Sequence, residues 1–248
     1  MSAAPILTVE GLRCTIAGQQ VVEDVTFEVP ATGITAVLGR NGVGKTSTLR
    51  GILGLIQRKG RVTLAGDRID GMPTHKVVRM GVGYVPEDRE VFAKLTVAEN
   101  LALAERQRHP RREFVAELFP DLVQRRDQQA GTLSGGQQQM VSVARALMND
   151  NRILLVDEPT KGLAPKIVTQ VADALLEASK TVPILLVEQN LEVVRRLAHG
   201  AIVIGGGRVV HTGRAAEILD DVDLTRRLLG VHAEAPVGDA SSDRRESR

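Results

Sequence analysis

The feature that most constrains this chain is a glycine-rich segment directly after a short apolar run. Gly39-Arg40-Asn41-Gly42-Val43-Gly44-Lys45-Thr46 fits the phosphate-binding loop pattern G-x-x-x-x-G-K-[ST] and follows the apolar run 34–38. The backbone N–H groups of such a loop can surround phosphate oxygens at a helix N-terminus, and its glycines let the main chain approach closely. A glycine turn that merely joins a strand to a helix is disfavoured, because the whole pattern matches in the required setting. The segment predicts a nucleotide site in an α/β fold.

Two side chains at the end of this loop carry its chemistry. Lys45 is expected to reach the β and γ phosphates of ATP, and the Thr46 hydroxyl is expected to ligate Mg²⁺. We therefore predict that residues 39–46, together with the adjacent Ser47, bind the nucleotide.

The composition excludes several other classes of protein. With 248 residues, 43% of them hydrophobic, the chain is long enough for one large α/β domain or two modest ones. Its 32 Lys and Arg balance 30 Asp and Glu, so it has no broad positive field for nucleic acid. The apolar runs are too short to cross a bilayer, and the start lacks a signal peptide. Any attachment to a membrane is therefore expected to come through a partner.

The pattern along the chain alternates apolar runs with helical patterns, which predicts a largely parallel sheet. Helices are expected at 96–106, 111–119 and 140–148, and after the phosphate loop, where Leu49, Ile52, Leu53 and Ile56 have helical spacing. The segment 88–133 is expected to be a helical insertion without strands. The composition after Gly230 predicts a disordered tail over 233–248. Strands are expected at 6–9, 21–29, 34–38, 81–85, 153–156, 183–187 and 201–204.

Two adjacent carboxylates, Asp157 and Glu158, end the apolar run 153–156. At the carboxyl edge of a sheet both can line a crevice, so we expect Asp157 to hold Mg²⁺ and Glu158 to polarise the attacking water. The alternative is that one of them simply caps the next helix.

A third motif, Leu133-Ser134-Gly135-Gly136-Gln137, precedes the helical pattern at 140–148. Ser134 and the two glycines at a helix N-terminus can form another phosphate cradle, although a serine before two glycines can also serve only to start a helix. Leu-Ser-Gly-Gly-Gln ahead of an Asp-Glu strand resembles the signature of the ATP-binding cassette (ABC) family.

This resemblance implies an α/β fold: a P-loop NTPase cassette with a mixed sheet core, an antiparallel β subdomain and an α-helical subdomain. Residues 1–232 would form a single ABC ATPase domain, with the helical subdomain at about 88–150 inserted in a RecA-like core. In that family two cassettes face each other head to tail. Ser134, Gly135, Gly136 and Gln137 would therefore bind the ATP held by the phosphate loop of a second chain.

Finer similarity points to one kind of transporter. The segments 84–92, 95–101, 157–165, 186–190 and 228–231 resemble the ATPase subunits of branched-chain amino-acid importers, specifically the shorter of their two ATPases. Urea and short-amide importers share most of these segments.

The resemblance implies a peripheral protein on the cytoplasmic side of the membrane, bound to permease subunits and served by an extracytoplasmic binding protein. A heterodimer with a longer ATPase is expected, and a homodimer is possible. An exporter ATPase, or a cassette that acts on nucleic acid or ribosomes, is the less favoured alternative.

Four positions depart from the general family pattern. Glu87 replaces the usual lid-loop glutamine at the metal, and Gln189 replaces the usual switch histidine near the γ-phosphate. Ile16 lies where an aromatic residue commonly stacks on adenine. The loop 161–164 reads Lys-Gly-Leu-Ala instead of Ser-Ala-Leu-Asp, so the usual aspartate that contacts the other cassette is missing. Because an amide cannot take a proton at neutral pH, Glu158 remains the expected general base, with Lys45 and Gln189 as the other catalytic residues.

Overall fold

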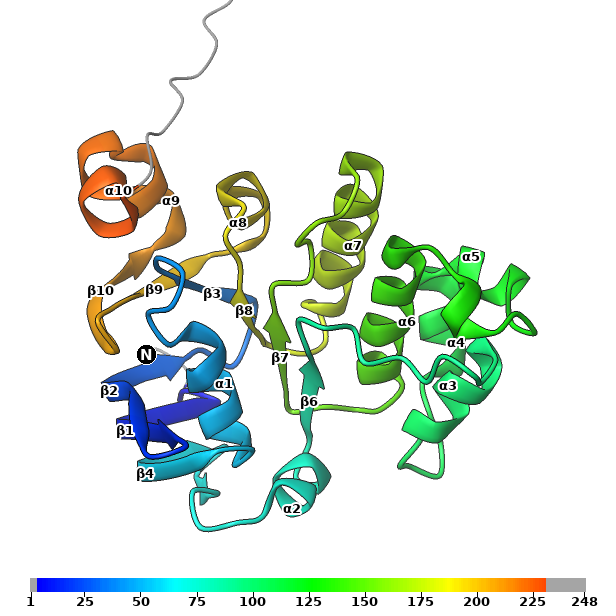
Figure 1. Ribbon diagram of the computed structural model, residues 1–248, viewed down its shortest axis with the longest axis horizontal. Helices are drawn as coiled ribbons and strands as arrows, with labels where there is room; N and C mark the ends of the chain where they lie inside the picture. Colours follow the sequence, from blue (N-terminus) through cyan, green and yellow to red (C-terminus); the bar gives the residue numbers. More distant parts are fainter. Residues whose placement is uncertain (1–3, 231–248) are drawn as a thin grey trace, which may run out of the picture.

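The computed structural model describes residues 4–230, which share one ten-stranded curled sheet in the order β5-β4-β1-β2-β10-β9-β3-β8-β7-β6 (Figure 1). The predicted tail 233–248 lies outside the described residues, as does Val231 of the similar segment 228–231. The strands are β1 (Leu7–Ile16), β2 (Gln19–Val29), β3 (Ile34–Leu38), β4 (Gln57–Leu64), β5 (Asp67–Arg68), β6 (Val82–Val85), β7 (Ile153–Asp157), β8 (Ile184–Val187), β9 (Gly200–Gly205) and β10 (Arg208–Arg214).

One end of the sheet is antiparallel and half exposed. β1 pairs with β2 on one side and with β4 on the other, so that Leu7 lies opposite both Val29 and Leu64. The burial of β2 alternates along much of its length, as expected for a strand with one buried face. β1 is much longer than the predicted segment 6–9, and β4 was not predicted. Its sequence Gln-Arg-Lys-Gly-Arg-Val-Thr-Leu buries only its last apolar residues, Val62 and Leu64.

The other part of the sheet contains the predicted parallel core. β6, β7, β8, β3 and β9 run parallel to one another, and every residue of β3, β7 and β8 is buried. Their carboxyl ends therefore meet at one edge of the sheet. The remaining unpredicted long strand, β10, pairs with β9 antiparallel and touches β2 through one parallel register pair, Arg208 with Asp24. It thereby joins the two parts.

Helices cover both parts of the sheet. Between β6 and β7 the described chain contains helices and no strand, as predicted, and these helices lie together on one side of the molecule (Figure 1). The helices are α1 (Lys45–Leu53), α2 (Thr74–Arg79), α3 (Val97–Ala104), α4 (Arg112–Leu118), α5 (Pro120–Gln124), η1 (Ala130–Thr132), α6 (Gly135–Leu147), α7 (Pro165–Ala178), α8 (Leu191–Leu197), α9 (Ala215–Asp220) and α10 (Val222–Leu229).

Two predicted helix boundaries are wrong. α1 ends at Leu53 because Gly54 adopts a left-handed conformation (φ 75°), so Ile56 lies beyond the helix and packs against the core from a different segment. α6 begins at Gly135 rather than at 140, because Ser134 caps it. The two glycines of the signature motif therefore form the first turn of α6.

The buried apolar residues form separate clusters on the two faces of the sheet. Leu154 and Val156 of β7 pack with α6 and α7, whereas Leu155 packs with α1 and the antiparallel strands. Because alternate residues of β7 face different clusters, the strand lies between two layers. Its last residue, Asp157, lies at the carboxyl edge of the sheet. No helix among residues 4–230 is both long and apolar enough to cross a membrane.

Candidate functional site

The phosphate loop joins β3 to α1 and has no room for side chains at two of its glycines. A Cβ at Gly39 would collide with the carbonyl oxygen of Ile204, and a Cβ at Gly44 would lie 2.6 Å from the carbonyl oxygen of Val21. Both glycines also have positive φ, 147° and 99°. The loop is thus held against β2 and β9 in a conformation that requires glycine.

A cavity of about 750 Å³ opens in front of this loop. It brings together residues from the ends of several strands that are far apart in the sequence. Of the predicted site residues, the loop segment 41–47, Glu87, Glu158 and Gln189 line it. The other lining residues are Gln19, Gln20, Val21, Glu23, Lys161, Gly206 and Gly207.

Lys45 is only 5% exposed, and its ammonium group is bound by the loop itself. Nζ donates hydrogen bonds to the carbonyl oxygens of Gly39 at 2.9 Å and Arg40 at 3.0 Å. Burial lowers the pKa of Lys45, while the nearby Glu158 and Asp157 raise it. The carbonyl groups of the loop therefore bind the ammonium group of Lys45. Phosphate oxygens bound at the loop can compete with these carbonyl groups for it.

Thr46 and Asp157 lie together beneath the loop. The Thr46 hydroxyl donates to Asp157 Oδ1 at 3.0 Å, and the Tyr84 hydroxyl lies 3.5 Å from Oδ2. Asp157 is completely buried, and burial, together with the carboxylates of Glu87 and Glu158, raises its pKa to about 6, although the Thr46 hydrogen bond lowers it. A hydroxyl in contact with a buried carboxylate supplies the oxygen ligands that Mg²⁺ prefers, so these residues fit the predicted metal.

Within residues 4–230, no three His, Cys, Asp or Glu side chains cluster as a metal site. A cation at Thr46 and Asp157 would therefore depend on phosphate oxygens and water for its remaining ligands.

Glu158 follows β7 and adopts a left-handed conformation, with φ 44°, which is unusual for a residue with a side chain. Its side chain is 7% exposed. Gln189, which follows β8, donates a hydrogen bond from Nε2 to Glu158 Oε1. Two residues predicted separately to act at the γ-phosphate thus contact each other.

Glu87 follows β6 and is linked to Glu158 through Lys161, for which no role was predicted. Lys161 Nζ contacts Glu87 Oε1 at 2.5 Å and Glu158 Oε2 at 3.3 Å. The contact with Glu158 has a signal in the sequence, because Lys161 lies three residues after Glu158. The contact with Glu87 has none, because Glu87 is 74 residues distant.

The signature residues lie outside this cavity. Ser134 caps α6: its Oγ accepts a hydrogen bond from Gln137 N at 3.3 Å, and Gln137 Oε1 accepts one from Ser134 N at 3.0 Å. The structural alternative, a helix cap, is therefore present. A role of Ser134, Gly135, Gly136 and Gln137 toward the ATP of another chain stays a prediction.

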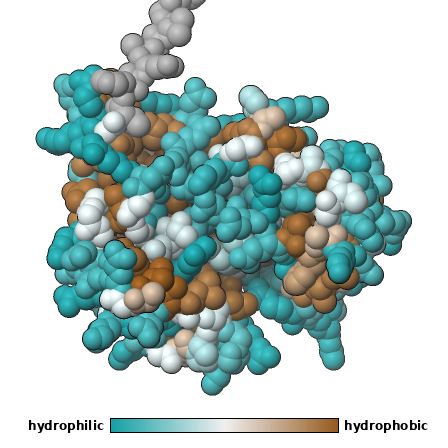
Figure 2. Space-filling model, viewed as in Figure 1, coloured by the Kyte–Doolittle hydropathy of each residue, from teal (hydrophilic) through white to brown (hydrophobic). Residues whose placement is uncertain are grey.

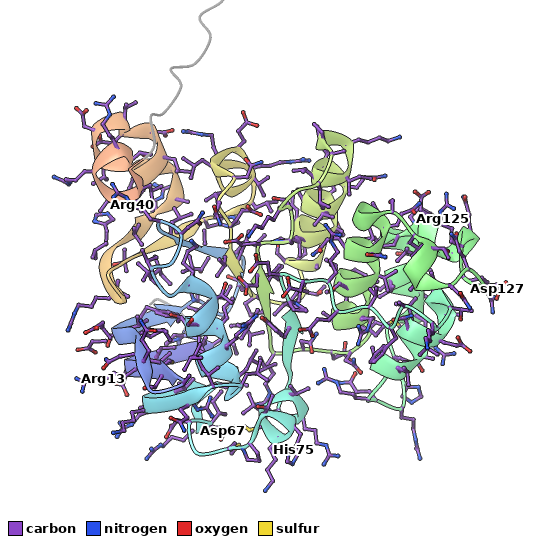
Figure 3. All side chains as sticks on the ribbon, in the orientation of Figure 1. Arg13, Arg40, Asp67, His75, Arg125 and Asp127 are labelled. Atoms are coloured by element: carbon purple, nitrogen blue, oxygen red, sulfur yellow. The ribbon has the colours of Figure 1, made fainter. Side chains whose placement is uncertain are left out.

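Three predicted nucleotide contacts, Ile16, Gly39 and Arg40, do not line the cavity. Ile16, at the end of β1, is 41% exposed and does not line it, whereas the nearby Gln19 and Gln20 do. The adenine contact of Ile16 stays a prediction. Arg40 lies beside the end of α10 (Figure 3), where a Cβ on Gly230 would collide with its guanidinium group. The side chain of Arg40 thus packs against the last helix, while its carbonyl group holds Lys45.

Comparisons with known proteins agree with this geometry. The sequence pattern of the ABC transporter family matches residues 22–161. The high-affinity branched-chain amino acid transport ATP-binding protein BraG of Pseudomonas aeruginosa is 37% identical over 218 residues, which cover 85% of this chain and 94% of BraG. The lipopolysaccharide export system ATP-binding protein LptB of Haemophilus influenzae is 31% identical over 235 residues, which cover 91% of this chain and 97% of LptB.

A solved structure shows the same fold. A nucleotide-free ATP-binding cassette from an ABC transporter superposes with a TM-score of 0.80 at 24% identity, covering 91% of this chain and 97% of that one. The family match and the full-length relatives confirm the predicted family and fold class. The chain belongs to the ABC transporter family and is an ATPase subunit of a transporter.

Proposed function

We propose that this ATPase powers an importer of branched-chain or related hydrophobic amino acids. The observation that carries the proposal is the similarity to BraG over nearly the whole of both chains, at 37% identity. LptB, which is named for lipopolysaccharide export, is less similar at 31% identity. Importers of urea or short amides are the alternative within the importer class.

Hydrolysis at this site would depend mainly on positioning and charge. ATP would enter the 750 Å³ cavity with its phosphates on the loop 39–47. Lys45 would then exchange its carbonyl partners for phosphate oxygens, and Glu158 would accept a proton from the attacking water as Gln189 orients its carboxylate. Thr46 and Asp157 would hold Mg²⁺, with Glu87 nearby, and the bound metal would neutralise charge on the phosphates.

The cavity supports a site shared between two chains. No residue of the segment 134–137 lines it, so the signature can act only on nucleotide held elsewhere. The proposed partner is a second ABC ATPase, in a heterodimer or a homodimer, with each signature facing the other chain's phosphate loop. Permease subunits would hold this pair on the cytoplasmic side of the membrane, and an extracytoplasmic binding protein would deliver the substrate.

The visible surface is compatible with attachment through partners rather than insertion. Figure 2 shows hydrophobic residues on one face in separate patches between hydrophilic ones. The exposed large apolar residues are likewise dispersed along the chain, among them Phe92, Leu103 and Val210. Apolar residues dispersed in this way are ordinary on a protein surface, so the proposed contact with permease subunits rests on the family similarity.

The proposal is tested by ATPase stimulation in proteoliposomes that contain the chain, its permease and its binding protein. Leucine, isoleucine, valine, urea and short amides are compared as substrates, with the Glu158→Gln variant as the control for background hydrolysis. Stimulation by the branched-chain amino acids is expected. Stimulation by urea or amides alone, or by lipopolysaccharide instead, would contradict the assigned substrate class.

A further inference from the structure

The predicted general base, Glu158, is covered by a lysine, Lys161. Lys161 Nζ lies 3.3 Å from Glu158 Oε2, and Gln189 Nε2 donates to the other oxygen, Oε1. Oε2 is fully buried and accepts no hydrogen bond, so Lys161 pairs with it by charge alone. One oxygen of the carboxylate thus accepts a hydrogen bond from Gln189, and the other is shielded from solvent beside the ammonium group of Lys161.

Lys161 also connects two loops of the site. Its second partner, Glu87, lies on the segment after β6, whereas Lys161 and Glu158 lie on the segment after β7. Contacts with both carboxylates raise the pKa of Lys161 to about 12, so the ammonium group stays charged at neutral pH. One cation therefore offsets two carboxylates, those of Glu87 and Glu158.

A simpler interpretation is an ordinary surface ion pair, of which the chain offers an example. Lys180 and Glu177 have the same spacing along the chain, three residues, and contact at 2.5 Å. The Glu177 side chain is 48% exposed, however, whereas that of Glu158 is 7% exposed. Lys161 also lines the cavity of the phosphate loop. Its partner is thus a buried site residue rather than a solvated one.

We propose that Lys161 is a positioning residue that holds Glu158 in a covered resting state until nucleotide phosphates draw its ammonium group away. This inference rests on the proposed role of Glu158 as the base. Lys161 shares its cavity with Lys45, so phosphate oxygens bound there compete directly for its charge. The Lys161 side chain is 58% exposed, and a partly exposed ion pair is weak enough to be broken by such a competitor.

The first test is steady-state ATP hydrolysis at saturating Mg²⁺ in the reconstituted transporter that contains the full-length chain. Lys161→Met is expected to raise kcat about two- to five-fold, since a partly exposed ion pair contributes little more than that factor. KM for ATP is expected not to fall, because the variant also loses a cation near the phosphates. Lys161→Arg, which keeps the charge, should retain the slow wild-type rate.

Lys180→Met is the matched control, because it breaks an ion pair of the same spacing away from the cavity. It should leave kcat and KM unchanged. A kcat of Lys161→Met that equals or falls below that of the control would overturn the proposal.

The second test does not depend on turnover. A carbodiimide condenses a carboxylate with an amine that touches it, forming an amide while the reagent becomes a urea. Mass spectrometry of the nucleotide-free chain should then find Lys161 joined to Glu87 or Glu158. A non-hydrolysable ATP analogue with Mg²⁺ should reduce this product several-fold. No product, or a yield that nucleotide leaves unchanged, would overturn the proposal.

The Glu158→Gln variant separates the two claims. If it hydrolyses ATP at the wild-type rate, the base assignment fails. If it is inactive while Lys161→Met shows no gain, the base assignment stands and only the role of Lys161 fails.

Discussion

The phosphate loop and the signature segment are both phosphate-binding motifs at helix N-termini, yet their surroundings differ. Lys45 and Asp157 are buried, and they contact groups brought together by parallel strands. Ser134 is exposed, and its side chain contacts only its own helix turn. The side chains of the first region have their partners within one chain and lie at the cavity. The signature segment begins a helix whose N-terminus does not line that cavity. This difference supports the proposal that each region is one half of a site completed by a second chain; the phosphate-loop region is the buried half and the signature segment is the exposed half.

The largest expected effect is on the buried half. Replacing Glu158 by Gln removes the proposed proton acceptor but keeps an acceptor for the hydrogen bond from Gln189. ATP hydrolysis in the reconstituted transporter should fall by about 10²- to 10⁴-fold, the usual contribution of a general base. Binding of ATP, measured with a fluorescent analogue, should remain. An activity near that of wild type would remove the base assignment.

A smaller loss is expected from the exposed half. Ser134→Ala removes one hydroxyl that would contact nucleotide on the other chain, so hydrolysis in the assembled transporter should fall by about 10²-fold, as for loss of one stabilising donor. Affinity of the isolated chain for ATP should not change, because Ser134 does not line its cavity. A comparable loss of affinity in the isolated chain would break the distinction between the two regions.

In the buried half, the charged carboxylate of Asp157 should also lower the stability of the protein, to an extent that depends on pH. Asp157 has a folded pKa of about 6, above its ordinary value of 3.8, so the folded protein binds this proton more tightly than the unfolded chain. Its contribution to stability is present below pH 3.8 and is lost as the pH rises through about 6.

Asp157→Asn should therefore raise the free energy of unfolding of the nucleotide-free protein at pH 7.5 by about 1–3 kcal/mol. The gain should shrink toward pH 4, where the wild-type carboxyl group is itself neutral. Urea unfolding at both pH values measures this difference. A variant that is less stable than wild type at pH 7.5 would show that the contact with Thr46 outweighs the burial of charge.

The smallest expected effect is on stability, and it distinguishes two roles of Ser134: the cap of α6 and the proposed phosphate contact. Ser134→Ala removes the side-chain cap of α6 and should cost about 1 kcal/mol in the free energy of unfolding. Ser134→Asn should restore most of this stability, because asparagine is also a good cap, but it should not restore hydrolysis. If Ser134→Asn recovers both, the serine serves only to start the helix.

The sequence predicted the parallel core and much of the site because those parts follow from local patterns. β3, β7 and β8 are short, mainly apolar runs. The glycine loop directly follows β3, and the two carboxylates lie at the end of β7. β4 and β10 were missed because exposed charged residues and glycine, such as Lys59 and Gly60, interrupt their apolar pattern. Pairing with neighbours, rather than their own composition, makes them strands.

The missed part of the site has a similar cause. The contact of Lys161 with Glu87 requires the segments after β6 and β7 to lie side by side, which follows from strand order. The positive φ of Glu158 also turns the chain in a way that no residue type there signals. Predicting adjacent carboxylates is possible from sequence, whereas predicting their counter-ion needs the topology.

Photocleavage by vanadate in the reconstituted transporter tests the central claim most directly. Vanadate trapped with ADP replaces the γ-phosphate, and ultraviolet light then cuts the backbone that it touches. The two regions do not share a cavity within one chain, so a shared site predicts cuts in both 39–47 and 134–137 of this chain. Cuts confined to 39–47 in a transporter that traps vanadate fully would contradict a site completed by a second chain.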